Sequence, residues 1–366
     1  MIRTLVAAAA LIPFAILLLP VFVFAALAVS FTSAVRSIGR LIEPSFMLWS
    51  DLIAFDRRLG WKFRPNLDAH YLAQLDDVHR IVTDGDGWPG RRSLDESRVV
   101  VIGDSFAVGY GVDTARSFSE ISSKRVKAVG AIGYSMVHGV LLMEQLELRL
   151  AGKLVVWFAY LENDLQDNLA PEMRQYRAPF VRINADSGEW EIVDGHVSPE
   201  KWGGSNADVR RLFPRMCVPG QFSDRAYSAA EYLIGRAQAV CVRAGARLVV
   251  VTIPHPMQMT ADGLEFMRTL CGPTPELCDQ DLPDRRIAES CRKRKVPMIA
   301  AKQFLSRRDY KRRESIHWNE RGHRRMAELL ERLDESFRSG ALDHYIPGAI
   351  VPVAEGITRQ PAESAS

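Results

Sequence analysis

The strongest constraint on the fold is a short run of branched apolar residues that ends in a Gly-Asp-Ser turn. Residues Val99–Ile102 read Val-Val-Val-Ile, and Gly103, Asp104 and Ser105 follow. A strand covered on both faces is continuously apolar and ends at turn residues, so this pattern predicts a buried parallel strand. Ser105 would lie just past its carboxyl end, at the edge of an α/β sheet where ligands bind. Alone, the tripeptide also fits an ordinary turn, so a functional role depends on partners elsewhere.

Similar apolar runs alternate with segments of helical period. Strands are expected over Leu154–Tyr160, Arg247–Ile253 and Val296–Ile299, and a further short element is expected before Gly133. Helices are expected over Ser117–Lys127, Met136–Leu150, Ala226–Ala244, Pro283–Lys295 and Arg321–Phe337. Strands that alternate with helices imply right-handed βαβ units and a parallel sheet. The sequence therefore predicts an α/β domain.

The chain divides into regions of different composition. We expect a transmembrane signal anchor over residues 1–35, and a neck and loops over 36–98 that pack on the main domain. The main α/β domain is expected over 99–345, with a cap-like insertion near 165–223 that contains a hairpin. A disordered tail is expected over 346–366.

The N-terminal region carries no charged residue from Leu5 to Val35. A membrane span needs about 20 apolar residues, whereas the apolar part of a cleavable signal has about 7–15. Length therefore favours an uncleaved anchor, although the sequence Ala26-Leu27-Ala28 leaves cleavage open. Cys271 and Cys278 bracket a turn-rich loop that a disulfide could close, which favours an oxidising exterior.

Charge and motif content argue against several classes of partner. The chain has 47 Lys and Arg against 44 Asp and Glu, a net charge of +3. Nucleic-acid binding usually shows a strong basic excess, so we expect no nucleic-acid partner. The spacing of His, Cys and carboxylate residues matches no metal-ligand motif, and no cofactor is expected.

Three later segments carry the residues that a serine nucleophile would need. A base is expected at His317, at the entry to the last helix, and Glu314 could hydrogen-bond its second imidazole nitrogen. Oxyanion donors are expected at Gly133 and Asn163, which follow the second and third strands. Taken singly, each also fits an ordinary helix-start, solvated or turn role. Their order at the ends of successive elements favours a functional site.

These segments resemble the four blocks of the SGNH (GDSL-type) hydrolases, a family of esterases, lipases and acyltransferases. The resemblance covers Val99 to about Phe337. It implies a flavodoxin-like, three-layer α/β/α fold with a central parallel sheet, here preceded by an N-terminal transmembrane helix. It also implies that Ser105 is the nucleophile, that His317 is the base, and that Ser105, Gly133 and Asn163 form the oxyanion hole. Glu314 stands where the family usually has Asp.

The histidine block, with its Trp-Asn and Gly-His, also resembles membrane-anchored or exported bacterial members that act on acyl groups of envelope polysaccharides. We therefore expect a membrane-anchored serine esterase, with a periplasmic or extracellular catalytic domain. It would remove acyl groups, in the first place acetyl, from an envelope or extracellular glycan or lipid through an acyl-enzyme. An O-acyltransferase that uses the same serine and an inactive glycan-binding module remain the alternatives.

Overall fold

The structure, a computed structural model, describes residues 46–74, 77–173, 176–199, 213–271, 275–311 and 316–344. The expected anchor over residues 1–35 and the expected tail over 346–366 lie outside these ranges. None of the helices inside them combines the length and the hydropathy that a membrane-spanning helix needs.

The centre of the fold is a sheet of five parallel strands. They are β6 (Val99–Gly103), β7 (Val126–Gly130), β8 (Leu154–Tyr160), β13 (Arg247–Ile253) and β14 (Met298–Ala300), in the spatial order β14-β13-β8-β6-β7. Counted along the chain this is the order 2-1-3-4-5, which is typical of flavodoxin-like sheets. The prediction of an α/β fold with a parallel sheet is therefore confirmed.

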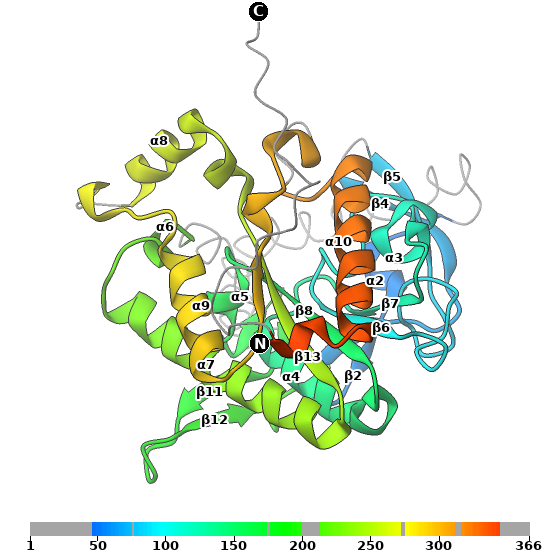
Figure 1. Cartoon of the computed structure of the whole chain (residues 1–366), viewed down its shortest axis with the longest axis horizontal. Helices are drawn as coiled ribbons and strands as arrows, with labels where there is room; N and C mark the ends of the chain where they lie inside the picture. The colour runs from blue at the N-terminus through cyan, green and yellow to red at the C-terminus, as the bar shows by residue number, and fades with distance from the viewer. Residues whose placement is uncertain are drawn as a thin grey trace, which may run out of the picture.

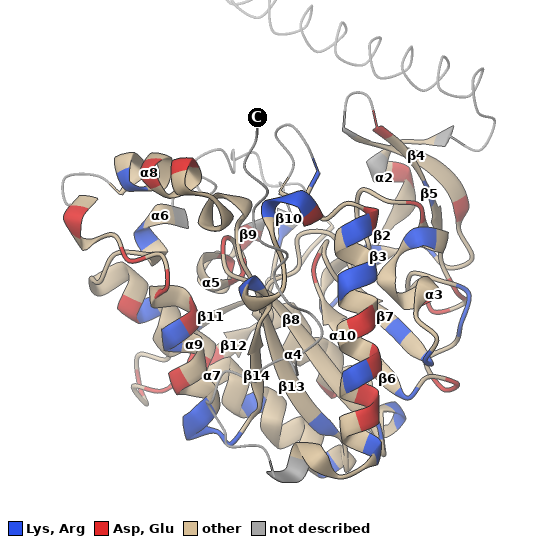
Figure 2. Ribbon diagram, turned by 45° about the horizontal axis from the view of Figure 1, so that its top comes forward, with Lys and Arg blue, Asp and Glu red and all other residues tan. Residues whose placement is uncertain are grey.

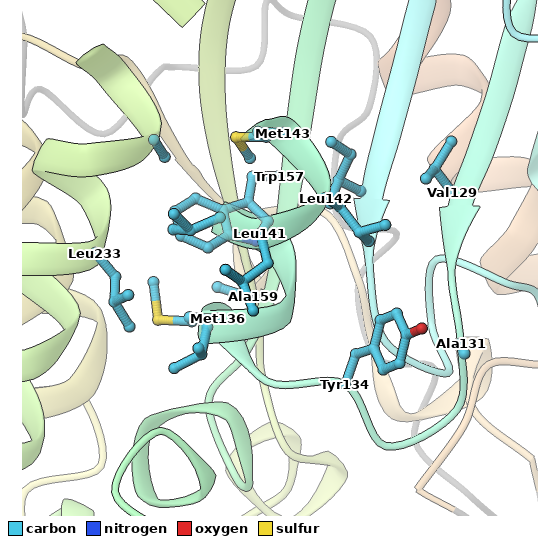
Figure 3. Packing of buried hydrophobic residues seen from close by; sticks show 14 of the residues in the cluster. Val129, Ala131, Tyr134, Met136, Leu141, Leu142, Met143, Trp157, Ala159 and Leu233 are labelled. Carbon is cyan, nitrogen blue, oxygen red and sulfur yellow. The ribbon is translucent and has the colours of Figure 1, made fainter. Parts of the chain in front are cut away.

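Helices cover both faces of this sheet (Figure 1). One face carries α3 (Phe118–Ile121) and α10 (Glu320–Arg338), and the other carries α4 (Met136–Gln145), α7 (Gln221–Ala244) and α9 (Leu282–Lys293). Successive side chains of a strand point to opposite faces of the sheet. Val99 and Val101 of β6 therefore belong to the core under α10, whereas Val100 and Ile102 belong to the core under α4 and α7. Figure 3 shows Trp157 of β8 in that second core, beside side chains of α4.

Helix α10 carries many charged residues, most of them partly or fully exposed, whereas the strands of the five-stranded sheet carry few (Figure 2). An exception is Asp334, whose carboxylate is fully buried and accepts two hydrogen bonds from the guanidinium of Arg98, at 2.6 and 2.7 Å. Arg98 directly precedes β6. This bidentate pair therefore fixes the carboxyl-terminal part of α10 to the start of β6.

The expected helix over Ser117–Lys127 is wrong in its second half. Helix α3 ends at Ile121 because Ser122 adopts an extended backbone, with ψ of 135°. Strand β7 begins four residues later at Val126, and all of its residues are buried. Strand β7 is the edge strand of the sheet, and the lysine inside it interrupts the apolar run by which a buried strand is recognised in sequence.

The side chain of Lys127 is 1% exposed, and its ammonium group binds to the loop that precedes β6. Its ammonium donates to the backbone carbonyls of residues 88–90, at 2.9–3.3 Å, and pairs with Asp84 at 2.8 Å. Burial lowers the pKa of Lys127, while the carboxylate of Asp84 favours its charged form. The lysine thus ties the N-terminal part of the chain to the sheet.

Two small sheets form most of that N-terminal part. The first contains β1 (Phe46–Met47), β4 (Asp68–Gln74) and β5 (Asp77–Val82), and the second pairs β2 (Ile53–Asp56) with β3 (Gly60–Phe63), after the short helix α2 (Trp49–Leu52). Strands β4 and β5 are antiparallel. Residues of this region, including Trp61 and Phe63, belong to the same core as α4 and α7.

The insertion contains the expected hairpin, which pairs β11 (Phe180–Ile183) with β12 (Trp190–Val193) in antiparallel register. The other described elements are α5 (Asp164–Asp167), β9 (Glu172–Met173), β10 (Tyr176–Arg177) and α6 (Phe213–Met216), with α8 (Ala261–Leu270) later in the chain. The indole of Trp190 donates to the hydroxyl of Ser228 on α7, at 3.0 Å. The role of the insertion as a cap stays a prediction.

All five cysteines are free thiols, so no disulfide joins Cys271 to Cys278.

Replacing Lys127 by Met should destabilise the fold by about 3–5 kcal/mol, because the buried carboxylate of Asp84 loses its cation. Urea unfolding of purified protein measures this loss. Lys124→Met is the matched control, since Lys124 pairs with the exposed Glu335 at 3.1 Å and an exposed pair contributes about 0–1 kcal/mol. Equal unfolding midpoints for the two variants would show that the Lys127 pair does not stabilise the fold.

Candidate active site

Ser105 lies in a tight turn that begins where β6 ends. The carboxylate of Asp104 accepts a hydrogen bond from the backbone N–H of Phe106, at 2.9 Å, and the backbone carbonyl of Asp104 accepts one from Val108, at 3.1 Å. The carbonyl of Ser105 accepts from the N–H of Tyr110, at 3.0 Å. These bonds wind residues 104–110 into one compact unit, which we call the nucleophile turn.

The segment that carries His317 is held on both sides of the histidine. The carbonyl of His317 accepts from the N–H of Lys311, at 2.9 Å, and Trp318 forms a backbone bridge with Tyr310. The side chain of Asn319 caps α10 by accepting from the N–H of Arg321, at 2.9 Å, and its amide donates to the carbonyl of Tyr310, also at 2.9 Å.

The structure brings Ser105 and His317 together. The Oγ atom of Ser105 lies 2.8 Å from the Nε2 atom of His317, which is within hydrogen-bond reach for a nucleophile and its base. A second, longer contact of 3.3 Å joins this Oγ to the carboxylate of Asp104. The imidazole packs between two rings of the nucleophile turn, with centroid distances of 5.1 Å to Phe106 and 4.6 Å to Tyr110.

Gly133 and Asn163 follow the two strands that flank β6. In the sheet, Gly103 pairs with Gly130 of β7, and Ile102 pairs with Trp157 of β8. Because the carboxyl ends of parallel strands meet at one edge, the turns that carry Ser105, Gly133 and Asn163 leave the sheet side by side.

The ends of β6 and β7 approach especially closely. A Cβ atom on Gly130 would lie 1.9 Å from the carbonyl oxygen of Gly103, so only glycine fits at this position. Gly133 itself has a φ of 82°, in the left-handed region that favours glycine. The last residues of β6 and β7 therefore lie in backbone contact.

The turn after β8 is fixed by carboxylates. The amide nitrogen of Asn163 donates to the carboxylate of Asp167, at 3.1 Å, and the buried carboxylate of Asp164 accepts from the N–H of Tyr160, at 2.9 Å. Burial raises the pKa of Asp164 well above its usual range, and the charge of Asp104 adds to this effect. The neutral acid is therefore favoured at Asp164, beside the nucleophile turn.

A second polar group lies at the ends of β8 and β13. The hydroxyl of Tyr160 donates to the carboxylate of Glu162, at 2.5 Å, and the Nε2 atom of His255 lies 3.7 Å from that carboxylate. Burial lowers the pKa of His255 to about 4, and the charge of Arg307 acts in the same direction. His255 is therefore neutral at physiological pH.

The expected role of Glu314 stays a prediction. Glu314, expected to bond the second imidazole nitrogen of His317, lies outside the described residues. Where the structure gives side-chain positions, no three His, Cys, Asp or Glu residues gather closely enough to hold a metal ion.

Sequence reasoning missed Tyr110 and Asp164. Tyr110 stands between two glycines of the nucleophile turn, and a large side chain in such a stretch is a signal for a packing role. Asp164 directly follows Asn163, but its burial depends on the turn after β8 and on Asp104. Neither contact can be read from local sequence.

The sequence matches no protein-family model and no curated protein. Among solved structures it resembles one described as TesA, with a TM-score of 0.35, 14% identity and coverage of 65% of this chain and 98% of that one. It also resembles a GDSL-like lipase from Bacteroides thetaiotaomicron, with a TM-score of 0.36, 12% identity and coverage of 68% of this chain and 92% of that one. A third similar structure is the psychrotrophic esterase EstA from Pseudoalteromonas sp., inhibited by monoethylphosphonate, with a TM-score of 0.37, 10% identity and coverage of 66% of this chain and 100% of that one. With scores and identities this low, the function proposed below rests on the site's own geometry. The solved structures that this chain resembles thus include a GDSL-like lipase, and GDSL-type hydrolases are the family that its sequence motifs resemble.

Proposed function

We propose that this chain is a serine esterase of the SGNH (GDSL-type) hydrolases, which cleaves a carboxylic ester through an acyl-enzyme. The observation that carries this proposal is the 2.8 Å contact between Ser105 Oγ and His317 Nε2, at the carboxyl edge of a parallel sheet. A serine hydroxyl is a weak nucleophile until a neighbouring base removes its proton, and a neutral imidazole at this distance is such a base.

The reaction proceeds in two halves. Ser105 Oγ attacks the ester carbonyl carbon as His317 Nε2 takes the hydroxyl proton. The tetrahedral intermediate then expels the alcohol, which receives that proton from His317, and the acyl group stays on Ser105. In the second half His317 takes a proton from water, the resulting hydroxide attacks the acyl-enzyme, and Ser105 leaves with its proton restored as the acid departs.

The oxyanion of each tetrahedral intermediate needs hydrogen-bond donors. The backbone N–H groups of Ser105 and Gly133 and the side-chain amide of Asn163 take this role in the proposal. An amide nitrogen carries two hydrogens, so the bond from Asn163 to Asp167 orients the amide while the second hydrogen serves the oxyanion. Removing one such donor typically reduces turnover by about 10²–10³.

The substrate in this proposal is an acylated glycan of the cell envelope, with acetyl as the acyl group. The uncharged run from Leu5 to Val35 supports a membrane anchor that holds the enzyme at such a surface. The likeness of the histidine block to membrane-anchored or exported bacterial members supports the glycan.

Ser105→Ala should abolish hydrolysis of 4-nitrophenyl acetate and labelling by a fluorophosphonate, because both reactions need the nucleophile. Release of nitrophenol and the mass of the labelled peptide measure the two effects. Ser290→Ala is the control, since Ser290 is equally buried but lies on α9. Activity of Ser105→Ala equal to that of wild type would overturn the proposal.

The pH profile should show a single acid limb, with kcat/KM falling about tenfold per pH unit, because protonated His317 accepts no proton. Burial lowers the pKa of His255 to about 4 and of His323 to about 3, with the charges of Arg307 and Lys311 as second causes. Both therefore stay neutral from pH 5 to 8. Stopped-flow or plate assays of wild type and His255→Gln should give the same limb; a displaced limb in the variant would assign the base elsewhere.

The full chain, extracted from membranes in detergent, should release acetate from an O-acetylated polysaccharide, with loss of acetyl mass from the glycan. Mass spectrometry of the glycan measures this, and Ser105→Ala is the control. A gain of acetyl when an acetyl donor is present would instead identify a transferase. Glycan binding without any mass change or fluorophosphonate labelling would identify a binding module.

A further inference from the structure

The N-terminal sheet contacts the nucleophile turn at Tyr110. The phenol hydroxyl of Tyr110 donates to the backbone carbonyl of Ala73 on β4, and its ring packs 6.0 Å from that of Tyr71 on the same strand. The other side of the turn faces the candidate base, because the Tyr110 ring centroid lies 4.6 Å from that of the His317 imidazole. One side chain therefore connects β4 to the histidine.

A second connection joins β5 to the segment beside His317. The ammonium of Lys311 pairs with the carboxylate of Asp77 and lies 3.0 Å from Nε2 of His79. Burial raises the pKa of Asp77, but hydrogen bonds from Lys311 and His79 outweigh it, so the pKa is lower than usual. The carboxylate therefore stays charged at neutral pH and holds Lys311, whose N–H donates to the carbonyl of His317.

Lys311 reaches β5 by passing over the nucleophile turn. A Cβ atom on Gly111 would lie 3.0 Å from the Cε atom of Lys311, and Gly111 has a φ of 88° that favours glycine. The N–H of Gly111 also approaches the hydroxyl of Tyr71, at 3.5 Å. Strand β4 thus contacts the nucleophile turn through Tyr110, and strand β5 contacts the segment beside His317 through Lys311.

We propose that Tyr110 is a positioning residue, anchored on β4, that holds the His317 imidazole in line with Ser105. The proposal rests on the esterase function proposed above and extends its machinery to the N-terminal sheet. An imidazole that is not packed on a ring can rotate about its side-chain bonds, and a misplacement of about 1 Å in such a pair can cost about 10²-fold in rate.

Two substitutions separate the ring from its anchor. Tyr110→Leu removes the ring that packs on His317, whereas Tyr110→Phe keeps the ring and removes only the bond to Ala73. The control is Tyr227→Phe, because the hydroxyl of Tyr227, like that of Tyr110, donates to a backbone carbonyl, here that of Met216 on α6.

Full-length variants are compared by kcat and KM for 4-nitrophenyl acetate, by the rate of fluorophosphonate labelling at Ser105, and by thermal unfolding. We expect kcat and the labelling rate to fall by about tenfold or more in Tyr110→Leu and by a smaller factor in Tyr110→Phe, with KM within about twofold of wild type. Tyr227→Phe should retain wild-type kcat. Because labelling needs the activated serine and no glycan contact, it reports the Ser105–His317 geometry directly.

Three results would overturn the inference. One is a wild-type kcat in Tyr110→Leu, and another is a loss that matches only the fraction of unfolded protein. The third is a change in KM at constant kcat, which would make Tyr110 a substrate contact. If wild-type protein itself neither hydrolyses the ester nor labels at Ser105, the proposed function fails and this inference fails with it.

Discussion

The contact between Ser105 and His317 joins two residues that are 212 positions apart in the chain, and the rest of the site depends on it. Ser105 is fixed by the sheet, because the turn that carries it begins directly after the last residue of β6. His317 lies in no regular element, so its position depends on separate attachments: a backbone bond from Lys311, the bridge of Trp318 to Tyr310, and the cap that Asn319 places on α10. Helix α10 is in turn fixed to β6 by Arg98 and Asp334. The two halves of the site therefore share one strand as their reference.

Local sequence predicted the elements whose stability comes from a simple apolar pattern. The bounds of β13 are those expected from its run of branched residues, and β6 and β8 were expected at their positions for the same reason. The order of strands brings the turns after β6, β7 and β8 to one edge, and these turns carry Ser105, Gly133 and Asn163, which the sequence singles out. The place of His317 beside Ser105 comes instead from the attachments of its own segment. Whether Gly133 and Asn163 serve as oxyanion donors stays a prediction.

The sequence could not predict features whose cause lies far along the chain. Lys127 looks like the polar end of a helix, yet it lies inside β7 because carbonyls and a carboxylate about 40 positions away satisfy its charge. Tyr110 and Lys311 are also placed by distant partners. Ala73 and Asp77, to which they bind, belong to strands that carry no recognisable sequence motif. In each case a polar group is placed by a tertiary partner, and hydrophobic periodicity carries no information about such partners.

The contacts of β4 and β5 also bear on where the structural unit around the Ser105–His317 pair begins. The recognisable motifs start at the strand before Ser105, yet Tyr110 and Lys311 are held by strands that precede it. A domain excised at the first motif would keep Ser105, Gly133, Asn163 and His317 and lose the strands that hold their surroundings. In evolutionary terms this candidate site is not a portable module. Recombination at the motif boundary would separate parts that have to change together, so the upstream strands and the α/β core are expected to be inherited as one piece.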